Sequence, residues 1–379
     1  MKKTRMTILN IIFSVLFLAV IFVPFCMLDT TEVIDSTLEN RRMTMWPGWH
    51  FDRETNEIYG YYAEDRVGFR EEAVRLYIET TYKLFGEFPE KVHMYGKEGE
   101  IFPSDTGYIR AYQHLATDEE LINNFVTYMD RTDEYLEQKG IPFFFLAGLD
   151  KKSVYGEYIP DYIRVAEDRE SIMEMLARRL DESGVEYVIP ISEYSLLKKD
   201  KRLYNKIADS AHWNAFGAME GLKILNARIR EKNPDVPVLS EEAFDLSYQD
   251  VQLEFISVPI IDNVPVYTLK KEYSDSIVID YDLIGKIKHN PGTNFIHYVN
   301  EKALSEESIL IMHDSFLEDK VNYFAYRYKD VYMISRQNYE LMQYYVETLQ
   351  PDVVVFENAE RAFVDDLYAY VNLANVTYE

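Results

Sequence analysis

Three short runs of apolar residues constrain the fold of this chain more than any other feature. They are Pro142–Gly148 (PFFFLAG), Ile309–Met312 and Val353–Phe356. A strand that is apolar at every position is typical of a parallel sheet that is covered on both faces. Helix-like segments alternate with these runs along the chain. This alternation predicts an α/β fold in which helices flank a parallel sheet.

The expected elements can be placed from the periodicity of apolar residues and from the turn residues between them. We expect helices over residues 61–85, 117–139, 168–182, 215–232 and 337–349, and strands over residues 142–148, 187–191, 308–313, 330–335 and 352–356. Thr117 is the expected N-cap of its helix, with Glu120 completing a capping box.

Two further segments interrupt this alternation. Residues 92–102 contain two glycines and predict short strands joined by a turn. Residues 234–300 hold short runs of Pro, Val, Ile and Tyr, which predict a β-rich insertion. We therefore expect a lead-in region over residues 29–100 and one α/β domain over residues 101–379.

The N-terminus predicts a membrane anchor. Lys2, Lys3 and Arg5 precede an apolar segment over residues 7–28, which is long enough to cross a bilayer. Basic residues on the N-terminal side predict that residues 1–6 are cytoplasmic and that the remainder is extracytoplasmic. A cleaved signal peptide is the alternative, although the segment lacks a small-x-small cleavage pattern.

Cysteine content and charge limit the remaining possibilities. The single cysteine, Cys26, lies in the apolar segment, so the predicted ectodomain has no disulfide. Its neighbour Phe25 is bulky where lipoprotein processing needs a small residue, which argues against lipidation. A formal net charge of −25 disfavours nucleic acid as a partner. With 31 Tyr and 21 Phe the chain has ample material for a core.

Two motifs carry the chemistry. Asp209 lies three residues before His212, and Ser315 follows the apolar run that ends near residue 313. An acid that orients a histidine base, together with a serine nucleophile, makes up a serine esterase or acyl-transfer site. Each residue also has a structural interpretation: Ser315 as a helix N-cap, His212 as a buried histidine and Asp209 as a cap of the helix near Asn214.

The order and content of these motifs resemble a known family. The pattern Asp-x-x-His-Trp-Asn-x-x-Gly-Ala from Asp209, followed by Asp-Ser-Phe after a strand, is similar to the SGNH-hydrolase-like proteins of the AlgX/AlgJ alginate O-acetyltransferase group, also called DHHW proteins. Further segments match in the same order: Glu39–Arg41, Asp65–Arg70, Leu84–Gly86, Gly96–Gly99, Asp150–Pro160 and Glu360–Arg361. The resemblance therefore spans nearly all of the chain after the apolar segment.

Two departures from the family pattern stand out. Many members hold the acid two residues before the histidine, where this chain has Ser210, and His313 replaces a glycine that often precedes Asp-Ser. The order of the motifs, with acid and histidine first and serine last, matches the permuted arrangement of the group.

The resemblance implies an activity and a set of site residues. It implies transfer of an acetyl group to a sugar hydroxyl of a cell-surface or exported polysaccharide, with a membrane-bound O-acyltransferase as donor. By this resemblance Ser315, His212 and Asp209 are catalytic. Asn214, Lys152, Tyr155 and Arg361 are the candidates for substrate binding. A structural role is the alternative for Lys152 and Tyr155, and pairing with a nearby acid is the alternative for Arg361.

The mechanism that these residues predict is an acyl-enzyme mechanism. Ser315 attacks the ester carbonyl, and its backbone N–H is the expected first oxyanion donor, with the Asn214 amide as the second. No metal or cofactor is required. The other histidines lack the paired spacing of a zinc site: His50, His93, His114, His289, His297 and His313. Two alternatives stay open, namely a carbohydrate acetylesterase with the same triad and a non-catalytic glycan-binding envelope protein.

Overall fold

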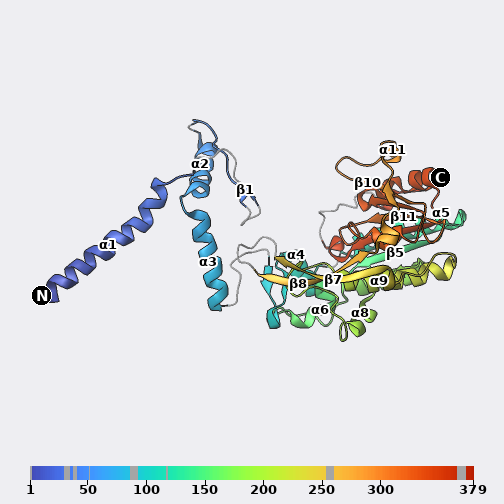
Figure 1. Cartoon of the computed structure of the whole chain (residues 1–379), viewed down its shortest axis with the longest axis horizontal. Coiled ribbons are helices and arrows are strands. Elements are labelled where there is room, and N and C mark those ends of the chain that lie inside the picture. The colour runs from blue at the N-terminus through green and yellow to red at the C-terminus, as the bar shows by residue number, and fades with distance from the viewer. Residues whose placement is uncertain are drawn as a thin grey trace. The chain divides into compact units, whose positions relative to one another are not determined.

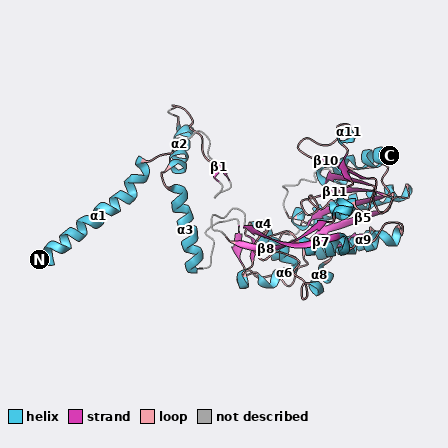
Figure 2. Ribbon diagram, viewed as in Figure 1, coloured by secondary structure: helices cyan, strands magenta, loops and turns pink. Residues whose placement is uncertain are grey.

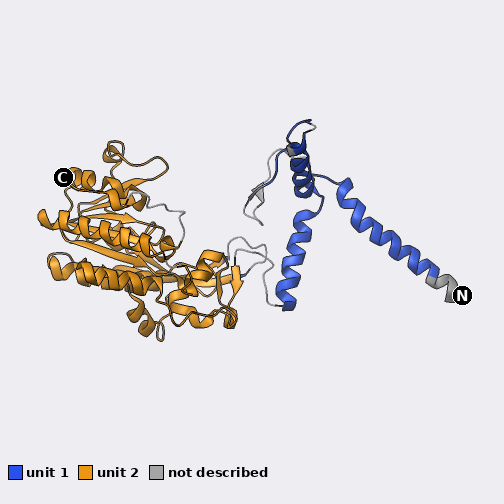
Figure 3. Ribbon diagram, turned by 180° about the vertical axis from the view of Figure 1, so that it is seen from behind, with its two compact units in different colours: residues 1–90, 252–260 blue, residues 91–251, 261–379 orange. Residues whose placement is uncertain are grey.

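A computed structural model describes most of the chain. The described residues are 2–29, 35–36, 41–50, 52–85, 93–116, 118–252, 260–364 and 373–379. Among the family-like residues, Glu39, Asn40 and Gly86 lie outside them. The chain divides into two compact units, residues 1–90 with 252–260 and residues 91–251 with 261–379 (Figure 3).

The first unit begins with a long apolar helix. Helix α1 covers Lys2–Cys26, and its segment Thr7–Cys26 has a mean hydropathy of 2.7, which is apolar enough to cross a membrane or to serve as a signal sequence (Figure 1). A short antiparallel pair follows, β1 (Asp35–Ser36) with β2 (Arg41–Arg42).

The helix expected over residues 61–85 is two helices instead, which corrects the prediction. Helix α2 covers Arg53–Arg66 and α3 covers Arg70–Phe85. Between them Phe69 adopts a left-handed φ of 59°, which ends the helical path. Gly68 lies at this corner because a Cβ there would be 2.4 Å from the Met27 carbonyl oxygen.

The connection between α2 and α3 also forms backbone hydrogen bonds with residues at the end of α1. The Gly68 N–H donates to Pro24 O at 3.0 Å, and the Asp29 N–H donates to Arg66 O at 2.9 Å. These backbone hydrogen bonds make the last turn of α1 part of the fold of the first unit.

A seven-stranded sheet forms the centre of the second unit (Figure 2). In spatial order its strands are β6 (Tyr187–Val188), β5 (Phe143–Gly148), β13 (Val353–Ala359), β11 (Ser308–His313), β12 (Asp330–Ser335), β10 (Phe295–Asn300) and β9 (Ile277–Ile279). The first five are parallel to one another, whereas β10 runs antiparallel to both β12 and β9. The predicted α/β class with a mostly parallel sheet is confirmed.

The central strands are buried along their whole length. Every residue of β5, β11 and β13 is buried, as their uninterrupted apolar runs predicted. Helices α5 (Glu119–Gln138) and α9 (Ala215–Lys232) cover β5 from opposite faces of the sheet (Figure 3). Phe125 of α5, for example, packs edge-on against Phe145 of β5 with ring centroids 5.3 Å apart.

Several predicted boundaries need correction. The cap of α5 is Asp118, which accepts from the Leu121 N–H; Thr117 lies outside the described residues. Helix α7 (Ile172–Ser183) begins later than expected, because Ser171 and Glu174 form its capping box. The last predicted helix starts as a 3₁₀ turn, Arg336–Leu341, before α13 (Met342–Leu349). The strand at 187–191 ends early, because α8 begins at residue 191.

Shorter helices complete the described part of the second unit: α4 (Thr106–Tyr112), α6 (Lys151–Tyr155), α8 (Ile191–Leu197), α10 (Lys271–Ser274), α11 (Tyr281–Ile284) and α12 (Asn322–Ala325). The expected strand-and-turn segment is also present, as β3 (His93–Tyr95), a 3₁₀ turn and β4 (Ile101–Pro103).

Residues 234–300 are rich in strands, as predicted, but they are not one inserted module. Strands β7 (Phe244–Gln252) and β8 (Ile261–Leu269) form a separate two-stranded sheet. Strands β9 and β10 instead extend the central sheet, because β10 pairs with residues 330–334 of β12 and β9 pairs with β10.

Candidate active site

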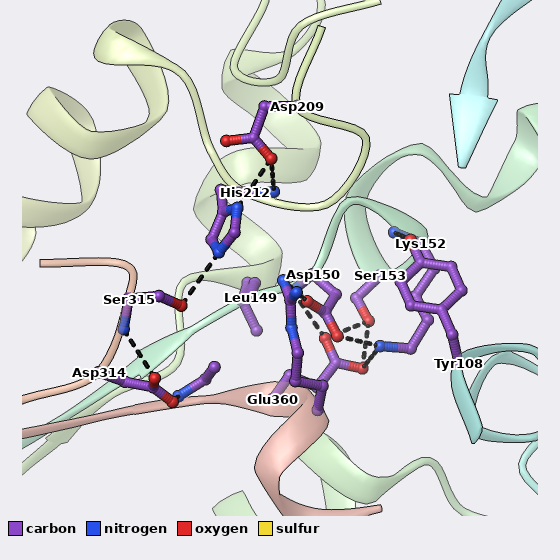
Figure 4. A network of polar contacts seen from close by, with 12 residues as sticks. Tyr108, Leu149, Asp150, Lys152, Ser153, Asp209, His212, Asp314, Ser315 and Glu360 are labelled. Carbon is purple, nitrogen blue, oxygen red and sulfur yellow. Dashed lines mark hydrogen bonds and ion pairs between the residues drawn. The ribbon is translucent and has the colours of Figure 1, made fainter. Parts of the chain in front are cut away.

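The structure brings Asp209, His212 and Ser315 together (Figure 4). His212 Nδ1 lies 2.7 Å from Asp209 Oδ1, and His212 Nε2 lies 3.0 Å from Ser315 Oγ. With the acid on one ring nitrogen and the serine on the other, Nδ1–H donates to the carboxylate and Nε2 accepts from the hydroxyl. This tautomer is the one that a histidine base needs.

Because Asp209 lies three residues before His212, its carboxylate can reach both the ring and the backbone N–H of His212. One carboxylate oxygen, Oδ1, accepts both from the His212 ring and from the His212 backbone N–H at 3.1 Å. Asp209 itself has a left-handed φ of 50°, a conformation that aspartate tolerates better than most residues. Burial alone would raise the pKa of Asp209, but the hydrogen bonds from His212 outweigh it and lower the pKa. The carboxylate therefore remains ionised below the ordinary range of aspartate.

Ser315 lies on the turn that follows β11, and Asp314 holds this turn. The Ser315 N–H donates to Asp314 Oδ1 at 2.7 Å, and Arg336 Nε pairs with Asp314 Oδ2 at 2.8 Å. The Ser315 N–H, the expected first oxyanion donor, therefore already donates to a carboxylate oxygen in this structure. A substrate oxyanion can use this N–H only after the Asp314 side chain turns away.

Behind this turn is a buried acid, Glu357 of β13. Its Oε2 accepts from the Asp314 N–H at 2.7 Å. Burial and the nearby charge of Asp314 raise the pKa of Glu357 well above its ordinary value. Asp314, Arg336 and Glu357 were not predicted as parts of the site. The only signal available was that Asp314 directly precedes Ser315.

Trp213 and Phe316 link the two motifs. Trp213 Nε1 donates to Phe316 O at 3.1 Å, and the two rings meet edge-on with centroids 5.1 Å apart. The His212 ring also packs against the Phe316 ring, with centroids 4.8 Å apart. Gly148 makes room for Phe316, since a Cβ at residue 148 would lie 2.6 Å from that ring. The residues next to His212 and Ser315 thus fix the distance between base and nucleophile.

The side chain of Asn214, the expected second oxyanion donor, makes three hydrogen bonds to backbone groups. Its Oδ1 accepts from the N–H groups of Phe216 and Gly217, and its Nδ2 donates to Arg202 O at 2.9 Å. The side chain is therefore the N-cap of α9. The amide of Asn214 thus binds backbone groups of the protein in this structure.

Lys152 belongs to a buried ion cluster that we define as Asp150, Lys152 and Glu360 (Figure 4). Lys152 Nζ lies 2.7 Å from Asp150 Oδ2 and 2.8 Å from Glu360 Oε1. Ser153 Oγ also donates to Glu360, at 2.7 Å. The Lys152 side chain is only 1% exposed, so the structure does not place it where a substrate reaches it.

Tyr155 is buried as well. Its hydroxyl accepts from the Leu203 N–H at 3.1 Å, and its ring packs against Tyr204 with centroids 5.8 Å apart. The structural alternative for Tyr155 is the one that these contacts favour.

Arg361 is the substrate-binding candidate that the structure leaves accessible. Its Nη2 pairs with Asp150 Oδ1 at 2.5 Å, which agrees with the expected pairing to an acid. Its side chain is 30% exposed, and its guanidinium carbon lies 5.5 Å above the ring of Phe316, the residue after Ser315. A cation thus lies next to the nucleophile turn.

The sheet explains why these groups meet. Asp150 follows β5, Ser315 follows β11, Arg336 follows β12 and Glu360 follows β13, so all four lie beyond the carboxyl ends of parallel strands. Ligand sites of open α/β sheets lie at this edge. Within the described ranges, the structure shows no group of three or more His, Cys, Asp or Glu that could hold a metal ion.

The second unit is thus an α/β domain in which hydrogen bonds connect Asp209, His212 and Ser315. No protein-family model matches the chain, and no curated protein matches it in sequence. Among solved structures, PatB1 of Bacillus cereus is similar at a TM-score of 0.55 and 13% identity, over 74% of this chain and 100% of that one. A second PatB1 structure, with a sulfonyl adduct, has a TM-score of 0.51 and 14% identity, over 67% and 94%.

A DHHW family protein from Eubacterium siraeum shares the fold too. Its TM-score is 0.52 at 12% identity, and the alignment covers 76% of this chain and 97% of that protein. The resemblance to the AlgX/AlgJ-like, or DHHW, proteins that the sequence predicted is confirmed at the level of the fold.

Proposed function

We propose that this protein is a membrane-anchored, extracytoplasmic O-acetyltransferase that acetylates a cell-surface or exported polysaccharide. The observation that carries the proposal is the hydrogen-bonded line from Asp209 through His212 to Ser315. The choice of acetyl as the acyl group and of a sugar hydroxyl as the acceptor is supported by the motif resemblance to alginate O-acetyltransferases. The fold shared with a DHHW family protein also supports it. The apolar segment 7–28 supplies the anchor, and a membrane-bound O-acyltransferase is the proposed donor.

The first half-reaction loads the acetyl group. His212 Nε2 takes the Ser315 proton while Ser315 Oγ attacks the acetyl carbonyl, and the tetrahedral intermediate collapses to acyl-Ser315 as the donor oxygen leaves with the proton from His212. Asp209 holds the ring and stabilises its positive charge. Arg361 supplies a cation for the developing oxyanion, together with the Ser315 N–H once Asp314 releases it.

The second half-reaction delivers the acetyl group to the acceptor. His212 removes a proton from a sugar hydroxyl, whose oxygen attacks the acetyl carbonyl. The bond from carbon to Ser315 Oγ then breaks, and the serine oxygen takes the proton back from His212. Ser315 is exposed, so water can replace the sugar, and an acetylesterase is therefore the second candidate function.

A sulfonyl fluoride tests the nucleophile directly, since PatB1 has been solved with a sulfonyl adduct. In this reaction Ser315 Oγ bonds to sulfur, fluoride leaves and His212 accepts the proton. The full-length protein in detergent should gain one sulfonyl group, and peptide mapping should place it on Ser315. Ser315→Ala should stay unmodified, whereas the exposed serine variant Ser192→Ala should react like the wild type.

Activity and acceptor are then measured together. The wild type should release p-nitrophenol from p-nitrophenyl acetate, and mass spectrometry of an added oligosaccharide should find an acetyl group on the sugar. Free acetate with an unmodified sugar would assign the esterase instead. If the folded wild type neither reacts with the sulfonyl fluoride nor cleaves the ester, the enzyme hypothesis is wrong. The remaining alternative is then a non-catalytic glycan-binding protein.

A further inference from the structure

Two of the three tryptophans of the chain are exposed, and both belong to the first unit. Trp213, in the second unit, is only 4% exposed, whereas Trp46 and Trp49 are 45% and 79% exposed. Neighbouring apolar side chains of this size that stay in contact with solvent are typical of a surface that binds a partner. The contacts of the two tryptophans indicate which partner this is.

Trp46 is the centre of an aromatic cluster on α2. The centroid of its ring lies 5.2 Å from that of Trp49. It lies 5.2 Å from the ring of Tyr59 and 5.1 Å from the ring of Tyr62, both residues of α2. The Tyr59 hydroxyl also donates to Gly48 O at 2.6 Å, between the two tryptophans in the chain. The segment that carries the exposed rings is therefore fixed to α2.

A series of contacts places this cluster next to the end of α1 (Figure 1). The guanidinium carbon of Arg66 lies 5.1 Å above the Tyr62 ring. Arg66 O accepts from the Asp29 N–H at 2.9 Å, and Asp29 is three residues after α1 ends. The four residues from Tyr62 to Arg66 span only about 6 Å along the helix. The cluster therefore lies close to the end of α1, whichever way α2 points.

Phe69 is exposed as well, at the corner between α2 and α3. It directly follows Gly68, whose N–H donates to Pro24 O at 3.0 Å. Pro24 belongs to the apolar segment Thr7–Cys26, so Phe69 lies level with the last turn of that segment. If this segment crosses a membrane, the Phe69 side chain lies at the boundary between lipid and water.

This boundary is an environment that suits all three aromatic side chains. The polar headgroup region is roughly 5–8 Å thick on each side of the hydrocarbon core. Tryptophan is enriched there because its ring is apolar while its N–H is polar. A membrane span that ends near Cys26 brings the residues hydrogen-bonded to its end to this depth. The rings of Trp46, Trp49 and Phe69 would then contact lipid instead of water.

We propose that Trp46, Trp49 and Phe69 form a membrane-contact surface that inserts into the headgroup region of the extracytoplasmic leaflet. The inference rests on the membrane anchor of the proposed function but not on the acyl-transfer chemistry. It goes beyond the anchor, because it assigns a lipid contact outside α1 to the folded part of the first unit. A second copy of the chain is the competing occupant. The hydrogen bonds to the end of α1 favour the bilayer, because they bring lipid to this surface without a further protein.

Tryptophan emission tests this contact, and Trp213 provides the internal control. The full-length protein is reconstituted into phosphatidylcholine vesicles, either plain or brominated near the headgroup end of one acyl chain, and flotation verifies insertion. Bromine quenches tryptophan only at short range. The wild type should lose about half of its emission in the brominated vesicles, because two of its three tryptophans lie at headgroup depth. Trp46→Phe/Trp49→Phe, which retains only the buried Trp213, should lose almost none.

Phe69 is tested by moving the fluorophore. In the Trp46→Phe/Trp49→Phe background, Phe69→Trp should restore quenching by the brominated lipid. Tyr281→Trp in the same background places a tryptophan at an exposed position of α11 in the second unit, and it should stay unquenched as the matched control. Equal quenching at both positions would overturn the assignment of the contact to the first unit.

The outcomes separate this inference from the proposed function. Protein that does not float with the vesicles would overturn the membrane anchor itself. Protein that floats but keeps its full emission in brominated vesicles would overturn only the contact surface. A cross-linked dimer that Trp46→Phe/Trp49→Phe fails to form, together with unquenched emission, would assign the surface to a second copy of the chain. Equal circular dichroism spectra and melting temperatures of wild type and variant exclude unfolding as the cause.

Discussion

Two polar clusters lie at the same edge of the central sheet and differ in their access to solvent. In the triad, the Asp209 side chain is 47% exposed and the His212 side chain 28% exposed. In the ion cluster of Asp150, Lys152 and Glu360, no side chain exceeds 5%. Both clusters pair a carboxylate with a cation or a base, so composition alone does not separate them. The exposed fraction of the side chains does separate the two clusters, because a group can act on a substrate only where the substrate can reach it.

The pKa values follow the same division. Burial opposes the charge on Asp150, but Arg361 and Lys152 outweigh it and lower the pKa of this acid. Burial likewise opposes the charge on Lys152, but Asp150 and Glu360 outweigh it and raise the pKa of the lysine. Each member keeps its charge only because its partners are present. The ion cluster therefore contributes to the stability of the fold, whereas the role that we propose for the triad is chemical.

The largest expected effect is on activity. Ser315→Ala and His212→Ala should each lower kcat for p-nitrophenyl acetate by about 10³-fold or more, and the double variant should be no worse, because the two residues act as a unit. Asp209→Ala should lose less, since the acid orients the base without attacking. Additive losses in the double variant would contradict this view of the triad.

The second effect is on stability. Lys152→Met should lower the free energy of unfolding by about 3–5 kcal/mol, because it leaves Asp150 and Glu360 buried without their cation. Urea unfolding followed by fluorescence measures this. Lys199→Met, at an exposed lysine of the same unit, should change little and is the matched control. A stable Lys152→Met protein with a raised acceptor KM would instead place Lys152 in substrate binding.

The third effect depends on pH. The pKa of Glu357 is raised in the folded protein, so the folded state binds more protons than the unfolded state above pH of about 4.3. Stability of the wild type should therefore fall as pH rises, by up to about 1.4 kcal/mol per pH unit until the folded pKa is reached. The stability of Glu357→Gln should not fall in this way as pH rises, so at pH 8 this variant should be more stable than the wild type. Glu120→Gln, at an exposed position on α5, should follow the wild type.

The smallest effect concerns Asn214. Asn214→Ala should cost about 1 kcal/mol of stability through loss of the α9 cap, and Asn214→Ser should recover most of it because serine also caps helices. Both variants should retain kcat within a few-fold when folded. A hundredfold loss of kcat in a stable Asn214→Ser protein would show that the amide is an oxyanion donor after all.

The sequence was sufficient for features that depend on neighbours along the chain. The runs that became β5, β11 and β13 were predictable because a strand buried on both faces needs apolar residues throughout. The pairing of Asp209 with His212 was predictable because three residues span a single turn. The position of Ser315 followed from the strand before it.

Features that depend on distant parts of the chain were not predictable. Whether the Ser315 N–H is available depends on Asp314, which Arg336 holds from the end of another strand. Lys152 is buried because Glu360, at the end of β13, covers it. The break between α2 and α3 depends on the close approach of Gly68 to Met27. Periodicity contains no information on such contacts.

The corner at Gly68 has a practical consequence for producing the protein. The last turn of α1 supplies the Pro24 carbonyl that accepts from Gly68, and Met27, the residue after α1, packs against Gly68. Cleavage after Cys26, whether by a peptidase or by the design of an expression plasmid, would remove this acceptor and make Met27, which packs against Gly68, the first residue of the chain. Preparations of the first unit should therefore retain α1 and be extracted in detergent, since a truncated version would lack the acceptor of the Gly68 N–H.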